Sequence, residues 1–169
     1  MNIEKYCWQQ VMLHWFSALV IIWALGSGFT VSLLDVEPST FERVAQVNSV
    51  VGTLFIPVFL LRCYFRIAVR LPRDVNGEGL AALVAHFTHL SLYGLTAVVL
   101  LSGILMMDRG IDLGGFTLPA MLSDDFWLSL WFDVHVFSCA LLAGLVLLHV
   151  VAVIKHELLG RRILQRMWF

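Results

Sequence analysis

Four long apolar stretches dominate the sequence, and short polar segments separate them. The stretches cover residues 8–34, 44–68, 80–107 and 126–154. Each reaches or exceeds the ~20 residues that an α-helix needs to cross the hydrocarbon core of a bilayer. The first is too long for the core of a signal peptide, and no small-residue cleavage site follows it. The pattern therefore predicts an all-α integral membrane protein, an up-down-up-down four-helix bundle in which residues 1–169 form one domain.

Composition and charge agree with this prediction and orient the bundle. The chain is 60% hydrophobic and 14% charged, with a mean hydropathy of +0.86, which is far from a soluble globular composition. If the N-terminus is inside, the outer loops hold only the cations Arg43 and Arg109. By the positive-inside rule both termini face the cytoplasm. The nine inner cations are Lys5, Arg62, Arg66, Arg70, Arg73, Lys155, Arg161, Arg162 and Arg166.

Two other features of the composition exclude classes of function. The outer loops are acidic, which disfavours nucleic-acid binding and weakly repels anions. The three cysteines are far apart in the sequence, with Cys7 just before the first apolar stretch and Cys63 and Cys139 in two others, so no disulfide framework, zinc site or covalent haem attachment is predicted. The acidic residues are Asp35, Glu37, Glu42, Asp108, Asp112, Asp124 and Asp125, with Asp133 at the mouth of the last helix.

The last apolar stretch carries two histidines, His135 and His149, on one helical face. Fourteen residues at 100° per residue return to within about 40° of the starting direction, and they place the two imidazoles roughly 21 Å apart along the axis. Ionisable groups inside a membrane are costly and usually mark a functional site. Since histidine is a common axial ligand, these two residues favour haem binding.

More histidines lie at the depth of His149. His14 lies about two turns inside the first helix, and His86 and His89 are one turn apart in the third. A single intramembrane histidine is well explained by a hydrogen bond between helices. Four imidazoles at one level instead favour a shared cofactor.

Two basic features belong to the predicted inner surface. Arg62 and Arg66 are four residues apart and share a face at the end of the second helix. Their side chains either reach lipid phosphate or pair with haem propionates or a quinone headgroup. The tail, residues 157–169, alternates basic and apolar residues and predicts a short amphipathic helix that anchors the chain at the membrane surface.

Short motifs in fixed order along the whole chain resemble those of the bacterial cytochrome b561 family, small four-helix membrane proteins that bind b-type haem. The resemblance implies a multi-pass protein of the bacterial inner (cytoplasmic) membrane. The motifs are Leu13-His14-Trp15, Arg62 with Arg66, His89-Leu90-Ser91-Leu92-Tyr93, Gly103-Ile104-Leu105-Met106-Met107, His135, Leu148-His149 and Lys155-His156.

The resemblance also implies two haems stacked across the membrane, with one departure in this chain. The inner haem would be bound by His14 and His149, and the outer haem by His135 and a histidine near the start of the second helix. Asn48 occupies that second position. The outer haem is therefore either five-coordinate on His135 or absent, with Met121 as the remaining alternative ligand. We expect two haems, with the outer site altered.

The function implied by the family is the transfer of single electrons between haem b and a membrane quinone. His89, Lys155 and His156 are the residues expected beside the quinone, and Arg62 and Arg66 those expected at the haem propionates. Some members of the family oxidise superoxide at the outer face. The acidic outer loops and the missing second histidine weaken that activity here, since superoxide is an anion.

Two other functions stay open. The chain could be a haem-bearing subunit that passes electrons between a partner dehydrogenase or hydrogenase and quinone, in which case it would not turn over alone. It could also be a haem-free bundle that uses its histidines for protons or a metal, although inward-facing histidines in a four-helix bundle usually hold a cofactor.

Overall fold

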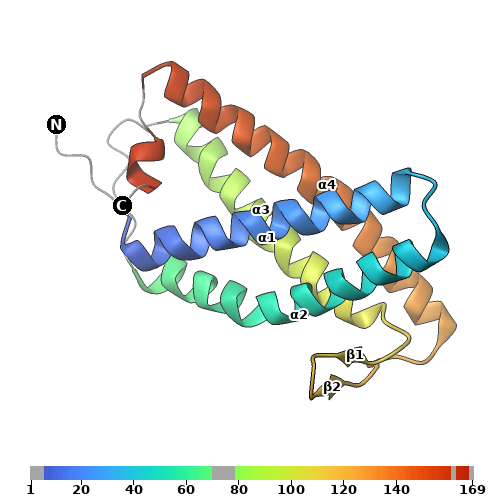
Figure 1. The fold of residues 1–169 in the computed structure, drawn as a ribbon. Helices are drawn as coiled ribbons and strands as arrows, with labels where there is room; N and C mark the ends of the chain where they lie inside the picture. Colours follow the sequence, from blue (N-terminus) through green and yellow to red (C-terminus); the bar gives the residue numbers. More distant parts are fainter. Residues whose placement is uncertain (1–5, 70–78, 161–162, 168–169) are drawn as a thin grey trace.

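The computed structural model describes residues 6–69, 79–160 and 163–167, and it is dominated by four long helices (Figure 1). Each is long and apolar enough to cross a membrane, which confirms the predicted spans. Helices of 31 and 34 residues are about 46 and 51 Å long, so the second and fourth extend beyond a hydrocarbon core of about 30 Å. The helices are α1 (Trp8–Leu33), α2 (Pro38–Ala68), α3 (Leu80–Leu105) and α4 (Asp125–Leu158).

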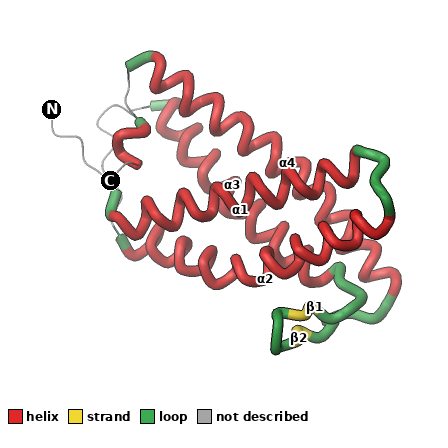
Figure 2. Tube along the Cα trace, viewed as in Figure 1, coloured by secondary structure: helices red, strands yellow, loops and turns green. Residues whose placement is uncertain are grey.

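The helices alternate in direction and form two closely packed pairs. α1 packs along α2 and α3 packs along α4, whereas α2 and α3 touch over a much shorter length. The start of α1, the end of α2, the start of α3 and the end of α4 lie together at one end of the molecule (Figures 1 and 2). We call this the terminal end, and we call the opposite end, where a small β-hairpin lies, the hairpin end.

Two helices begin earlier than the hydrophobic pattern predicts. α2 starts at Pro38, because proline suits the first turn of a helix, where its missing N–H costs nothing. α4 starts at Asp125, and the Asp124 carboxylate caps it by accepting a 2.9 Å hydrogen bond from the Phe126 N–H. The polar first turns of α2 therefore extend it into a segment expected to be a loop, whereas α4 begins only one residue before the predicted stretch.

The long connection between α3 and α4 forms the β-hairpin. β1 (Ile111–Asp112) and β2 (Thr117–Leu118) pair antiparallel, and Gly114 and Gly115 adopt positive φ angles in the turn between them. Ile111 is buried and β1 contacts α2. The connection thus folds against the hairpin end of the bundle.

The C-terminal segment differs from the predicted amphipathic helix over residues 157–169. α4 continues to Leu158, and Gly160, at φ +78°, ends it. The described part of the tail then forms a single short 3₁₀ helix, η1 (Leu164–Met167). The Trp15 indole N–H donates to the Met167 carbonyl at 3.0 Å, so the tail packs against the start of α1.

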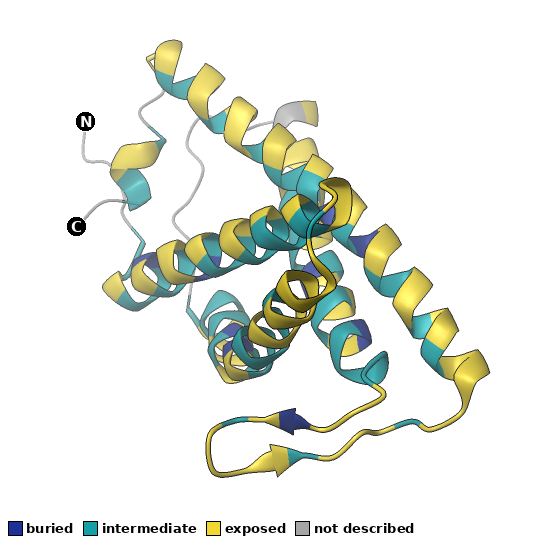
Figure 3. Cartoon of the chain, turned by 45° about the vertical axis from the view of Figure 1, so that its right-hand side comes forward, coloured by how far each residue is buried: buried dark blue, intermediate teal, exposed yellow. Residues whose placement is uncertain are grey.

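Most of the helical surface is apolar and exposed, and the buried core is small (Figure 3). Three of the buried side chains, Ser17, Thr96 and Ser102, donate to the carbonyl four residues earlier in their own helix. Small hydroxyl residues at helix contacts allow close approach and are typical of membrane helices, whose apolar outer surface faces lipid. Burial therefore agrees with the hydropathy of the sequence.

Candidate functional site

All four helices contribute polar side chains to one cluster at the terminal end. An Arg62 Nη2 atom of α2 lies 3.1 Å from His14 Nδ1 of α1. The rings of His89 on α3 and His149 on α4 lie 5.3 Å apart, edge to face. Arg62 joins these two groups, since it also contacts Tyr93 of α3. We call this set the terminal cluster: His14, Arg62, Arg66, His89, Tyr93 and His149.

The guanidinium groups of Arg62 and Arg66 both contact Tyr93. Arg62 Nε donates to the tyrosine hydroxyl at 3.1 Å, and the Arg62 and Arg66 guanidinium carbons lie 4.9 and 5.8 Å from the ring centroid. Such cation–π contacts orient both cations. In the described part of the chain, the one ion pair is the exposed Arg109–Asp108 contact, so neither arginine has a carboxylate partner there. Two oriented cations without a carboxylate suit an anionic ligand.

The contact between Arg62 and His14 would have to change before His14 could bind a haem iron. A guanidinium group can only donate, so His14 Nδ1 accepts, and the neutral ring carries its proton on Nε2. For His14 Nε2 to ligate iron, Arg62 must release Nδ1, and a propionate is a better acceptor for a guanidinium than an imidazole is. Arg62 can therefore bind a propionate and, by doing so, leave His14 free to bind iron.

The donor set of the terminal cluster fits haem b. Imidazoles come from three different helices, so two can approach a flat macrocycle from opposite faces, as in other haem-binding bundles. The arginines of α2 supply the countercharge for propionates. In this respect the structure brings together five of the predicted residues: His14, Arg62, Arg66, His89 and His149.

The fourth histidine expected at this depth does not join the cluster. His86 is exposed, and its ring lies against the neighbouring Phe87 ring, edge to face with centroids 6.1 Å apart. His89, three residues later, lies on the side of α3 that faces α4. The prediction of four clustered imidazoles was therefore wrong for His86, because helix rotation directs it away.

Two buried polar atoms on α1 and α4 have no hydrogen-bond partner in the described residues. One is Nδ1 of His156, which was predicted, and the other is Oε1 of Gln10, which was not. Gln10 precedes His14 by four residues and His156 follows His149 by seven, so each shares a helical face with a cluster histidine. The four-residue spacing was the available signal for Gln10.

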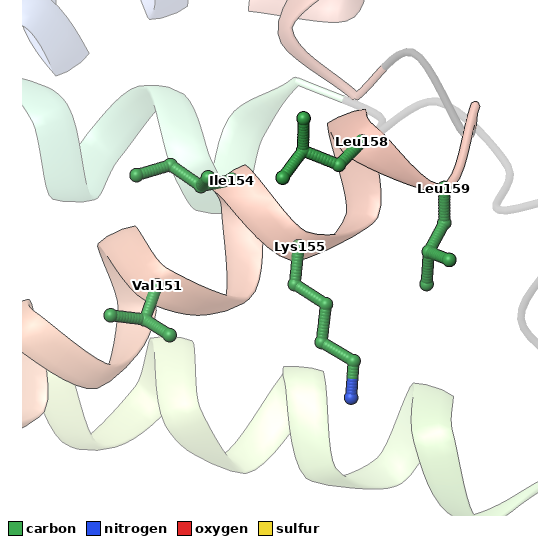
Figure 4. Close-up of a pocket in the computed structure, with 5 residues that line it drawn as sticks. All are labelled: Val151, Ile154, Lys155, Leu158 and Leu159. Atoms are coloured by element: carbon green, nitrogen blue, oxygen red, sulfur yellow. The ribbon is translucent and has the colours of Figure 1, made fainter.

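Lys155 takes a different position from its neighbour His156. It is exposed and lines an open, otherwise apolar groove along the end of α4, with its side chain extending away from the helix (Figure 4). Its role beside a quinone stays a prediction. The groove is lined by Val151, Ile154, Lys155, Leu158 and Leu159.

The residues predicted for an outer haem belong to the hairpin end, where His135 and Asn48 contact different helices. His135 contacts α3, where its Nδ1 lies 3.1 Å from both the Val99 carbonyl and Ser102 Oγ. Asn48 instead faces α1, accepting from Ser27 Oγ at 2.9 Å. Met121 is exposed in the connection to α4.

Comparison with known proteins agrees with these observations. Residues 5–169 match the family model described as prokaryotic cytochrome b561. No protein in the curated set matches the chain. Because the match covers nearly the whole sequence, and because four apolar helices and a haem-compatible cluster accompany it, this chain belongs to the prokaryotic cytochrome b561 family of multi-pass membrane cytochromes, which carry b-type haem and transfer electrons.

Proposed function

We propose that the chain passes single electrons between a haem b held in the terminal cluster and a membrane quinone. The observation that carries this proposal is the convergence of three imidazoles and two guanidinium groups in a bundle that is otherwise apolar. When bound, haem b supplies one-electron redox chemistry. The protein's own part is to position the ligands, provide the countercharge and exclude water.

Within the cluster we assign His14 and His149 as axial ligands and Arg62 and Arg66 as propionate partners. The two histidines come from α1 and α4, which belong to different helix pairs, and would hold the haem between the pairs. The ring of His89 packs against the His149 ring in a T-shaped arrangement. In that position it holds the His149 ring in orientation and leaves a polar group beside the haem.

The quinone headgroup has its best partners in His156 and Gln10. His156 Nδ1 and Gln10 Oε1 are buried and unpartnered in the described residues, and an unsatisfied buried polar atom costs about 1–3 kcal/mol. A headgroup carbonyl would accept from a protonated Nδ1, and a headgroup hydroxyl would donate to Oε1. His156 can thus hold or move a proton at Nδ1 while electrons pass.

The orientation follows from the distribution of charge. In the sequence, nine of the eleven cations fall in the segments expected on the inner side, so we place the terminal end, with both termini, on the cytoplasmic side of the bacterial inner membrane. Quinone and lipid are then the partners at this surface. A redox partner protein, such as a dehydrogenase or hydrogenase, stays an alternative electron donor.

The test is reduction of the purified cytochrome by a soluble quinol in lipid nanodiscs, followed by absorbance. We expect a b-type spectrum and rapid reduction without a second protein. His156→Ala should slow reduction at least tenfold with an unchanged spectrum, whereas the exposed control His86→Ala should change neither.

Three other outcomes would count against parts of the proposal. A protein without haem absorbance would overturn the proposal as a whole. Equal rates in the wild type and His156→Ala would remove His156 from the quinone site. Reduction only in the presence of a dehydrogenase or hydrogenase would favour the partner alternative.

A further inference from the structure

We propose that this chain binds one haem, in the terminal cluster, and that polar contacts within each helix pair replace the second haem at the hairpin end. This inference rests on the proposed function and concerns the haem count and the route of electrons. It differs from the two haems expected from the sequence. The reason lies in the contacts of His135 and Asn48 and in the charges around them.

His135 is a packed part of the interface between α3 and α4. The Ser102 hydroxyl donates its hydrogen to the Val98 carbonyl at 2.7 Å, so towards His135 both Ser102 Oγ and the Val99 carbonyl are acceptors. The imidazole therefore donates its Nδ1–H to α3. A Cβ added at Gly103 would lie 3.2 Å from the ring, which shows how closely the ring rests on the α3 backbone.

The free lone pair of this imidazole is directed at its own helix. With the proton on Nδ1, the lone pair is on Nε2, the atom that an iron would need. Nε2 lies 3.5 Å from Cys139 Sγ, one turn further along α4, and can accept from that thiol. Every nitrogen of His135 thus has a partner within the α3–α4 pair, unlike the unpartnered Nδ1 of His156.

A second axial ligand is also missing opposite His135. Asn48 accepts from Ser27 Oγ at 2.9 Å and donates to the Ala24 carbonyl at 3.4 Å, so both ends of its amide are bound to α1. The hydroxyl of the next residue, Ser49, lies 3.4 Å from Met107 Sδ and donates its hydrogen to the Ala45 carbonyl at 2.9 Å. Both ends of the Asn48 amide are thus held by α1, which leaves that side chain no free atom for iron.

The two ends also differ in the cations that they offer to a haem propionate. Haem propionates are anions, and the terminal cluster offers them Arg62 and Arg66. At the hairpin end the two cations, Arg43 and Arg109, are exposed, and Arg109 is paired with Asp108 at 3.9 Å. The nearby loop carboxylates would repel propionates.

A single haem at the terminal end changes the path of electrons. They must enter and leave on the side of the membrane that holds both termini, because no second carrier lies at the hairpin end. Superoxide arriving at the opposite face would then have no acceptor within reach. The donor is expected at the terminal-end surface instead.

The test is haem stoichiometry after titration of the purified chain with excess haemin, measured by pyridine haemochrome against amino-acid analysis. We expect one haem per chain and a purely low-spin electron paramagnetic resonance spectrum. Two haems per chain, or a high-spin signal from a second iron, would overturn the single-haem inference and leave the proposed function intact. No bound haem would overturn the proposed function itself.

Two variants of His135 test the same inference separately from folding. His135→Gln keeps a polar side chain for α3 but offers no imidazole, and His135→Ala removes both. Each should bind as much haem per folded chain as the wild type. A drop in stoichiometry in His135→Gln, with its helical circular dichroism unchanged, would show that His135 is an iron ligand.

Discussion

The two ends of the bundle use polar side chains in opposite ways. At the terminal end, Arg62 of α2 contacts both His14 of α1 and the Tyr93 hydroxyl of α3, so polar groups of the two helix pairs meet there. At the hairpin end, Asn48 binds α1 and His135 binds α3, each within its own helix pair. We infer that a ligand is held where polar groups of the two pairs meet, whereas His135 and Asn48 stabilise the fold.

This difference matters most for α4, which carries both kinds of histidine on one face. His149 meets another imidazole, while His135 meets a carbonyl, a hydroxyl and a thiol. The residue type and its helical face are therefore not sufficient to define a haem ligand. The neighbouring helix decides whether the ring is left free for a cofactor.

The largest effect is expected from removal of a terminal-end ligand. His14→Ala and His149→Ala should each abolish the low-spin haem, because a single imidazole cannot form a six-coordinate site. Absorbance and electron paramagnetic resonance spectra of the purified variants measure this. His86→Ala is the matched control and should retain the wild-type spectrum. A normal six-coordinate spectrum in both ligand variants would shift the assignment to His89.

A smaller effect is expected when a terminal-end cation is removed. Arg62→Ala should lower the midpoint potential of the haem, because a positive charge favours the reduced state. A unit charge roughly 8–16 Å away at an effective dielectric constant of about 20 contributes about 1–2 kcal/mol, or about 40–90 mV for one electron. Redox titration measures the shift. Arg43→Ala at the hairpin end should leave the potential unchanged, and equal shifts in both variants would contradict the comparison.

Substitutions at the hairpin end should change the stability of the protein and leave its redox chemistry unchanged. Asn48→Leu removes two hydrogen bonds to α1 and should cost roughly 0.5–2 kcal/mol, the usual range for polar contacts between membrane helices. Reversible unfolding in dodecyl sulfate micelles, followed by circular dichroism, measures this cost. Gln46→Leu, an exposed position on the same helix, is the control. A changed haem spectrum in Asn48→Leu would place Asn48 at a haem site.

The smallest effect is expected at Gly103. Alanine there would bring its Cβ to 3.2 Å from His135, whereas at Gly94 on the same helix nothing lies within 4 Å. Both changes gain helix propensity, but only Gly103→Ala must displace a ring that is fixed by hydrogen bonds. It should therefore be less stable than Gly94→Ala by about 1 kcal/mol. Equal stability in the same unfolding assay would show that the His135 ring is loosely held.

The sequence by itself determined the membrane spans, the order of the helices and the depth of each histidine. Hydropathy over ~20 residues is set by the bilayer and needs no knowledge of neighbouring helices. The motifs with His14, His89 and His149 were likewise sufficient for the family, which the match over residues 5–169 confirms. The early start of α2 at Pro38 was missed because its first turns are polar.

Only the tertiary structure decided which polar groups meet. His86 and His89 have nearly the same depth, but the rotation of α3 against α4 exposes one and brings the other to His149. The partners of His135 and Asn48 lie 36 and 21 residues away along the chain, on α3 and α1. No local pattern encodes such contacts, because the packing of whole helices fixes how each side chain is turned towards its neighbours.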